Sequence, residues 1–128
     1  HFGQQDSYIE EARQHWNAPH KLIGISTHNL QQAQLAQAAG ADYIGIGPIY
    51  PTQSKINPDP VVGIDEGSRI AAAVSCPSVA IGGIQIEKIV SLRKSAFDAF
   101  CVLGVVNNSD QPFKIIQQLQ QEWQDAEV

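Results

Sequence analysis

Residues 40–55 read GADYIGIGPIYPTQSK, and this stretch decides how the rest of the chain is interpreted. Gly40 ends the helical spacing of residues 30–39 and supplies a helix stop. Residues 43–47 form a near-continuous apolar run that is too short for a helix, which favours a strand covered on both faces. Residues 48–63 carry no periodic pattern, and loops this long in compact domains are usually functional or disordered. The stretch therefore predicts a helix, a buried strand and a long loop, in that order.

The order of strand and helix repeats on both sides of this stretch. Further apolar runs of strand length lie at residues 22–26, 78–82 and 100–104. Helical patterns lie at residues 7–16, 30–39, 65–74 and 86–94, and again from Pro112 onward. This alternation predicts βα units and a parallel α/β sheet. Four units make half of an eight-stranded barrel, which needs about 200 residues or more. The alternative is a small open sheet, in which four strands without a reversal leave no obvious crevice.

The charge balance excludes two kinds of partner. The 128 residues carry 8 basic and 13 acidic side chains, with a formal net charge of −5 and a pI near 5.2. A surface for nucleic acid or an anionic membrane needs clustered lysine and arginine. No apolar run approaches the roughly 18–20 residues of a membrane span.

Cys76 and Cys101 are too few for a disulfide framework and fit a reducing compartment, which predicts a cytoplasmic protein. The sequence leaves the oligomeric state open, with a homo-oligomer as one alternative.

The strand at residues 22–26 ends in polar side chains, since residues 23–29 read IGISTHN. In one interpretation, Ser26 donates a hydrogen bond to an anion or a substrate at the strand end. In the other, Ser26, Thr27 or Asn29 caps the helix that follows. His28 is a candidate acid or base, although such a histidine is more often exposed or packed at a helix start.

The long loop opens with two hydroxyls and an ammonium group within four residues, at Thr52, Ser54 and Lys55. Pro48 and Pro51 precede these groups and stiffen the chain there, because each proline ring fixes its own φ. Hydroxyls, backbone N–H groups and one lysine together suit a phosphate or a diphosphate. The alternative is a surface turn with a solvated lysine. The long loop and its position after a strand favour the phosphate site.

The last two strands end in residues that also suit an anion. Gly82 and Gly83 lie at the end of the strand at 78–82, where paired glycines let the backbone approach a ligand or simply form a tight turn. Leu103 and Gly104 end the strand at 100–104 and are expected beside them. In barrels, the loops after the last two strands often form a phosphate site.

Asp6 follows a glycine at what could be another strand end. A carboxylate there suits Mg²⁺ that bridges a diphosphate, and the alternative is a helix N-cap. Cys76 and Cys101 are expected to be core or junction thiols rather than nucleophiles. Trp16 and Trp123 are expected to be packing residues on helices.

Together these stretches resemble the thiamine phosphate synthase family. The pieces HFGQQD, IGISTHN, GADYIGIGPIYPTQSK and VAIGGI, and a strand ending at Leu103 and Gly104, occur in the family's order and cover essentially the whole chain. The resemblance implies a (β/α)₈ TIM barrel, of which residues 1–128 are roughly the last four βα units, with the N-terminal half absent. The chain begins at His1 and contains no methionine, so we expect its N-terminus to have been cut or left unseen.

The resemblance also implies an activity and residue roles. The family is a transferase of thiamine biosynthesis that joins a pyrimidine diphosphate to a thiazole phosphate, both small molecules. By matching motif positions, Asp6 would be one Mg²⁺ ligand, and Ser26 and Lys55 would hold the diphosphate and act in catalysis. Residues that would contact the thiazole phosphate or its ring are Thr52, Gln53, Ser54, Gly83, and the backbone of Leu103 and Gly104.

Three departures from the family limit these expectations. The family's basic diphosphate-binding motif and its Asn-Asp pair are not in residues 1–128, so this part alone should be inactive. Ser54 stands where threonine is usual. Ala96, Ala99 and Gly104 stand where the family favours glycine, glycine and serine. Two other functions stay open: the related thiazole tautomerase, for which His28 is the candidate base, and a non-catalytic phosphate-binding or assembly module.

Overall fold

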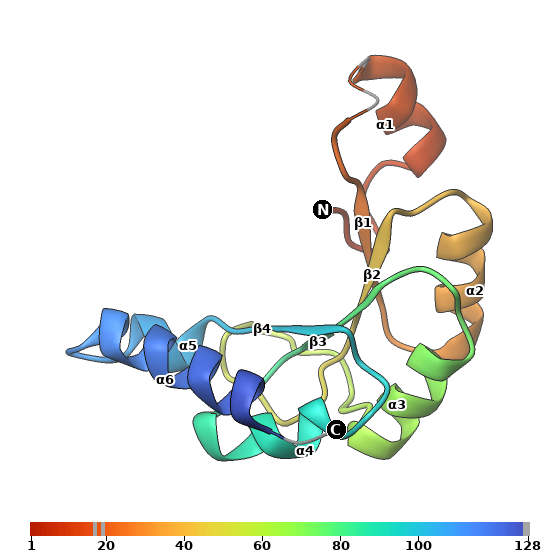
Figure 1. Cartoon of the computed structure of the whole chain (residues 1–128). Helices are drawn as coiled ribbons and strands as arrows, with labels where there is room; N and C mark the ends of the chain where they lie inside the picture. The colour runs from red at the N-terminus through yellow and green to blue at the C-terminus, as the bar shows by residue number, and fades with distance from the viewer. Residues whose placement is uncertain (17, 19, 127–128) are drawn as a thin grey trace.

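The computed structural model describes residues 1–16, 18 and 20–126. Four parallel strands form one sheet in chain order (Figure 1): β1 (Gly24–Thr27), β2 (Tyr43–Ile46), β3 (Ser78–Ile81) and β4 (Ala99–Cys101). Helices α1 (Ile9–His15), α2 (Leu30–Ala38), α3 (Ile64–Ala72), α4 (Ile89–Arg93), α5 (Gly104–Asn107) and α6 (Pro112–Asp125) alternate with them, and η1 (Ile86–Lys88) leads into α4. The predicted α/β architecture with a parallel sheet is confirmed.

The strands bury alternate side chains because successive residues of a strand point to opposite faces. Ile44 and Ile46 of β2 are fully buried on the face that α2 and α3 cover. The other face carries Ser26 and Gly45 together with Tyr43, Val79 and Ile81, and the β4 residue Cys101 on it is exposed. We expected coverage on both faces. Within the described residues, α2, α3 and α4 lie along the outer side of a curved sheet (Figure 1), so one face is covered.

The chain before α1 adds a further bridge at the edge of the sheet. Phe2 pairs in parallel with Ile25: the Phe2 N–H donates to the Gly24 carbonyl and the Ser26 N–H donates to the Phe2 carbonyl, each at 2.9 Å. Residues 1–3 therefore lie beside β1 in the manner of a neighbouring strand. Asp6 follows that segment, as the sequence predicted. At the opposite edge, β4 pairs with β3 alone among the described residues.

One predicted strand end is wrong, and one predicted helix has a first turn of a different type. Leu103 and Gly104 do not end a strand, because the Leu103 carbonyl accepts from Val106 and Asn107 and the chain turns into α5. The helix expected at 86–94 begins as the 3₁₀ turn η1.

Two predicted packing roles also differ from the structure. Trp16 follows the end of α1 and is 52% exposed, whereas Trp123 packs on Phe100 with ring centroids 5.1 Å apart. Cys101 is exposed on β4, so it is not a core thiol. Among the described helices, none is long and apolar enough to cross a membrane.

Candidate functional site

A cavity of about 1150 Å³ lies at the carboxyl ends of the four strands. Parallel α/β folds place ligands at this edge because the loops that follow the strands converge there. The cavity is lined by eight of the nine residues expected to form the site, namely Ser26, Thr52, Gln53, Ser54, Lys55, Gly83, Leu103 and Gly104. These residues come from the ends of β1, β2, β3 and β4, so the fold joins segments that are far apart in sequence.

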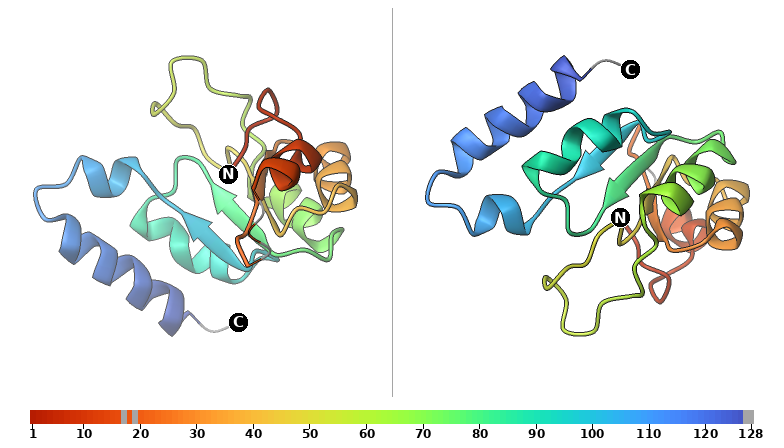
Figure 2. Two further views of the ribbon diagram at one scale, coloured as in Figure 1. Left: turned by 90° about the horizontal axis from the view of Figure 1, so that it is seen from above. Right: turned by 90° about the horizontal axis from the view of Figure 1, so that it is seen from below.

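The loop of residues 48–63 forms one wall of the cavity and projects from the body of the molecule (Figure 2). Its first residues are tied to the end of β3, because the Ile49 N–H donates to Ile81 and the Tyr50 N–H donates to Gly82. The Ile49 side chain is 1% exposed and anchors the loop in the core. The hydroxyls and the ammonium group therefore extend from a fixed base.

Gly82 and Gly83 make the close approach between this loop and β3. Both have positive φ, at +98° and +64°, a conformation that side chains rarely adopt. A Cβ at Gly83 would lie 2.7 Å from the Tyr50 carbonyl oxygen and would also overlap that of Pro51. Gly82 and Gly83 therefore form a tight turn, and the backbone that approaches Gly83 closely is that of Tyr50 and Pro51, while Gly83 also lines the cavity.

Three titratable groups meet inside the cavity. Asp59 Oδ2 lies 3.6 Å from His28 Nε2 and 3.8 Å from Lys55 Nζ. His28 Nδ1 lies 2.6 Å from the Gly47 carbonyl oxygen, which can only accept, so the imidazole donates from Nδ1. The Lys55 side chain is 67% exposed, which leaves its ammonium group able to meet an anionic ligand.

The helix cap after β1 is Asn29, whose side-chain oxygen accepts from the Gln32 N–H at 2.9 Å. Ser26 is therefore not the cap, and its hydroxyl contacts His1 Nε2 at 2.8 Å beside the cavity. Asn29 therefore caps the helix. The Ser26 hydroxyl lies at the cavity, where it can contact a ligand.

Asp6 does not line the cavity and does not cap α1, whose N-cap is Tyr8. Its Oδ2 accepts from the Gly3 N–H at 2.6 Å, in the turn that follows the bridge beside β1. No group of three or more His, Cys, Asp or Glu side chains that could hold a metal occurs in the described part of the chain. Mg²⁺ is commonly held by one or two carboxylates with phosphate oxygens, so one exposed carboxylate at this edge fits a substrate-bound Mg²⁺ and not an all-protein site.

Several residues near the site were not assigned from the sequence. His1 stands in the quoted HFGQQD motif, but nothing local indicates that its ring reaches Ser26. Asp59 lies within the long loop, where a lone carboxylate is usually solvated. Asn108 also lines the cavity, and its side-chain nitrogen lies 3.6 Å from where a Cβ at Gly104 would stand.

Comparison with known proteins gives consistent matches. A family model described as thiamine monophosphate synthase matches residues 1–106. The thiamine-phosphate synthase of Clostridium botulinum is 41% identical over 110 residues, which are 86% of this chain and 53% of that protein. The thiamine-phosphate synthase of Koribacter versatilis is 46% identical over 104 residues, which are 81% of this chain and 49% of that protein. The chain thus spans about half the length of the curated relatives it matches.

Solved structures of known proteins also match this chain. Thiamine phosphate pyrophosphorylase from Pyrococcus furiosus superimposes with a TM-score of 0.86 at 30% identity, over 99% of this chain and 59% of that one. A geranylgeranylglyceryl phosphate synthase from Thermoplasma acidophilum superimposes with a TM-score of 0.66 at 15% identity, over 84% of this chain and 50% of that one, which shows a shared fold alone. With the family model matching most of its length, the chain belongs to the thiamine monophosphate synthase family.

Proposed function

We propose that the protein carrying this chain joins hydroxymethylpyrimidine diphosphate to hydroxyethylthiazole phosphate, giving thiamine phosphate and diphosphate. The observation that carries the proposal is the convergence of Ser26, residues 52–55, Gly83 and Gly104 on one cavity at the carboxyl edge of the sheet. Hydroxyls, an ammonium group and glycine backbone suit two phosphorylated small molecules.

In this proposal, Lys55 and Ser26 hold the diphosphate of the pyrimidine substrate. The bond between the pyrimidine methylene carbon and the diphosphate oxygen breaks, and its electron pair leaves with the diphosphate. The thiazole nitrogen then donates its lone pair to the methylene carbon. Lys55 and Ser26 stabilise the charge that develops on the departing oxygen, which is electrostatic catalysis. No side chain of this chain needs to remove a proton.

The thiazole phosphate is assigned to other residues that line the same cavity. Gly83 and the backbone of Leu103 and Gly104 would cradle its phosphate, and Thr52 and Ser54 would contact it or the ring. Asp6 would be the ligand from this chain to a Mg²⁺ ion, which when bound neutralises charge on the diphosphate.

The test is a coupling assay on the full-length protein, with Mg²⁺ and after its removal by a chelator. We expect thiamine phosphate only with Mg²⁺, and loss of most turnover in Lys55→Ala because a diphosphate partner is removed. Lys114→Ala is the matched control, since Lys114 is exposed on α6 and does not line the cavity. Unchanged turnover in Lys55→Ala would refute the role of Lys55.

Thiazole tautomerisation is a second candidate, because His28 lies in the cavity with Nε2 directed toward Asp59. A tautomerase needs such a base, whereas the coupling reaction does not. We therefore expect His28→Ala to leave coupling largely intact. Tautomerisation without coupling would decide for the second candidate, and binding of phosphate without either reaction would decide for a non-catalytic module.

We also infer a cytoplasmic location, since Cys76 and Cys101 are both free thiols.

A further inference from the structure

The imidazole of His1 lies between two hydroxyl groups. Its Nε2 is 2.8 Å from Ser26 Oγ and its Nδ1 is 3.0 Å from Tyr43 Oη. The three residues come from the segment beside β1, from β1 itself and from β2, and they are separated by 25 and 42 positions in the chain. They form a continuous hydrogen-bonded line that ends at the cavity, because Ser26 lines the cavity.

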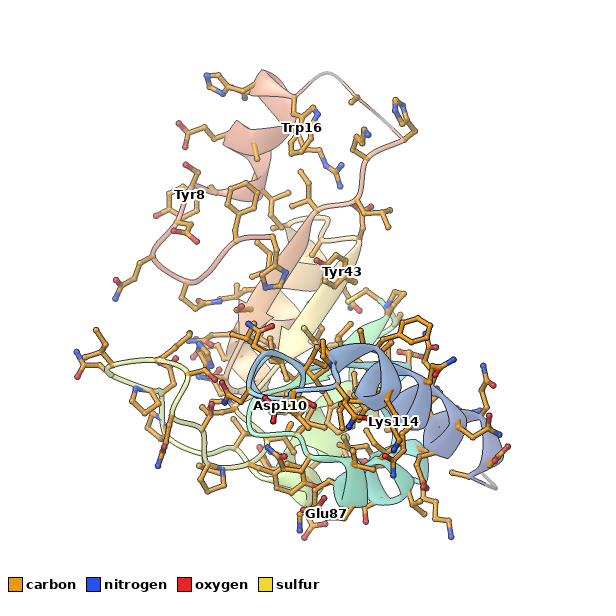
Figure 3. All side chains as sticks on the ribbon, turned by 90° about the vertical axis from the view of Figure 1, so that its left-hand side faces the viewer. Tyr8, Trp16, Tyr43, Glu87, Asp110 and Lys114 are labelled. Atoms are coloured by element: carbon orange, nitrogen blue, oxygen red, sulfur yellow. The ribbon has the colours of Figure 1, made fainter. Side chains whose placement is uncertain are left out.

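The tyrosine at the far end of this line is held in place by its neighbours. Gly24 of β1 stands opposite Tyr43 in the parallel register, and a Cβ on Gly24 would overlap the Tyr43 ring. The ring therefore lies over the glycine, and Figure 3 shows Tyr43 beside the strands. It stacks on the His1 ring with centroids 5.6 Å apart and an interplanar angle of 27°. This packing aims the phenolic oxygen at His1 Nδ1.

Proton placement along this line decides what Ser26 can do. A neutral imidazole has one N–H donor and one acceptor nitrogen. If Tyr43 donates to Nδ1, Nε2 carries the proton and donates to Ser26 Oγ, and the Ser26 hydroxyl proton is left for a ligand. In the reverse arrangement, Ser26 donates to His1 and presents only lone pairs to the cavity, which repel an anion. A phenol O–H is more acidic than an aliphatic O–H and is therefore the better donor to imidazole.

We infer that His1 and Tyr43 are positioning residues that make Ser26 a hydrogen-bond donor to the diphosphate group of the substrate. The inference rests on the proposed function, because the proposed diphosphate contact of Ser26 is the interaction they serve. His1 and Tyr43 do not themselves line the cavity. They act through the hydroxyl of Ser26, and no covalent step involves them.

The first measurement is the tautomer of His1 in the full-length protein, from the ¹⁵N chemical shifts of its imidazole. We expect Nε2 to be protonated in the wild type, and we expect Tyr43→Phe to give a mixture because the donor to Nδ1 is lost. A wild-type His1 protonated on Nδ1 alone would overturn the inference. The wild-type measurement, which by itself can overturn the inference, requires neither turnover nor a variant.

The second measurement is the binding of inorganic diphosphate by calorimetry. Loss of one neutral hydrogen bond changes affinity by roughly 2- to 10-fold, so we expect Tyr43→Phe to weaken binding within that range. Tyr8→Phe is the matched control, since Tyr8 is 79% exposed and lies away from the sheet on the segment before α1 (Figure 3). We expect the Tyr8 variant to bind as the wild type does.

A pair of substitutions at His1 separates positioning from packing. His1→Gln keeps an N–H donor for Ser26, whereas His1→Phe keeps the stacked ring and removes the donor. We expect diphosphate affinity close to the wild-type value in the first variant and a several-fold loss in the second. Wild-type affinity in both His1→Phe and Tyr43→Phe would overturn the inference. A wild-type protein that binds no diphosphate would instead overturn the proposed function, whatever the His1 tautomer.

Discussion

Asp42 and Asp98 each stand one residue before a strand, and each accepts a hydrogen bond from the start of the neighbouring strand. Asp42 Oδ2 accepts from the Ile23 N–H and from Arg13, both at 2.6 Å. Asp98 Oδ2 accepts from the Ser78 N–H at 2.8 Å. These contacts satisfy N–H groups at the amino ends of strands, opposite the candidate site, and we interpret them as structural.

Asp42→Asn tests this interpretation through its pH dependence. The hydrogen bond from Ile23 and then the Arg13 guanidinium lower the pKa of Asp42 below its ordinary value of 3.8. Because the folded pKa is lower than the unfolded one, the carboxylate stabilises the fold above about pH 4 and loses this effect as pH falls through the folded pKa. We expect the free energy of unfolding of Asp42→Asn to be roughly 1 kcal/mol lower than that of the wild type at pH 7. The loss is modest because the Asp42–Arg13 ion pair is partly solvated.

Thermal unfolding at pH 7 and near pH 3 measures this difference. The gap in Tm between wild type and Asp42→Asn should narrow at the lower pH. Asp110→Asn, at an exposed position before α6, is the control and should show little change at either pH. A gap of equal size at both pH values would contradict the assignment to the carboxylate.

Gly83→Ala tests the contact between the long loop and β3. The substitution places a Cβ against the Tyr50 carbonyl and also forces alanine to adopt positive φ. Gly40→Ala is a matched control, because Gly40 has a φ of +87° and nothing within 4 Å of an added Cβ. We expect about 1 kcal/mol of destabilisation in the control and 1–3 kcal/mol more, roughly, in Gly83→Ala.

The measurement for this pair is urea unfolding, together with protease cleavage within residues 48–63. Faster cleavage of the loop should occur in Gly83→Ala only, because only there is the loop displaced. Equal stability losses in the two variants would show that the conformation of the glycine matters and the loop contact does not.

At the scale of elements, the last helix is held by one narrow stripe. Leu119 of α6 is 2% exposed, whereas Phe113 on the same helix is 72% exposed. Trp123 continues the stripe by packing on Phe100 and beneath Arg93, whose guanidinium lies 5.2 Å from the ring centroid. The helix α6 thus has a buried part packed toward α4 and β4 and an exposed part at its N-terminal turn.

Leu119→Ala should therefore destabilise the protein much more than Phe113→Ala. Removing a buried leucine leaves a cavity and typically costs 2–5 kcal/mol, roughly. An exposed side chain usually changes stability by less than about 0.5 kcal/mol. Chemical unfolding of both variants measures the difference, and comparable losses would mean that Phe113 is covered in the protein as it exists.

At the scale of the whole molecule, a barrel and an open sheet differ in whether the face of the sheet away from the helices is exposed to solvent. The chain spans about half the length of the relatives it matches. On the face away from the helices, Cys101 is exposed within the described residues. Further βα units that close a barrel would cover this face, whereas an open sheet would leave it accessible.

Thiol labelling of the polypeptide of residues 1–128 and of the full-length protein tests the two architectures. Burial raises the pKa of the half-buried Cys76 thiol, so it holds less reactive thiolate. We expect Cys101 to react faster than Cys76 in the polypeptide and to slow markedly in the full-length protein. Cys101→Ser assigns the fast phase. Equally fast labelling of Cys101 in both forms would favour the open sheet.

The arrangement of elements was predictable because the signals for it are local. Apolar runs of strand length, helical spacing and Gly40 are each read within a few residues, and they predicted four strands and the order of helices between them. The boundary at Leu103 and Gly104 was not predictable in this way, since an apolar run does not show where its backbone turns into α5.

The residues of the candidate site likewise fall into those that local sequence predicted and those that only tertiary structure brings together. Thr52, Ser54, Lys55, Gly83 and Gly104 were named from the sequence because each lies in a segment that follows a strand, and parallel strands bring their carboxyl ends to one edge. Gln53 was named from the family resemblance alone. The contact of Ser26 with His1 and of His1 with Tyr43 was decided only by tertiary structure. It depends on the parallel register that sets Gly24 opposite Tyr43 and on residues 1–3 pairing beside β1. Register is a relation between strands, and no single stretch of sequence contains it.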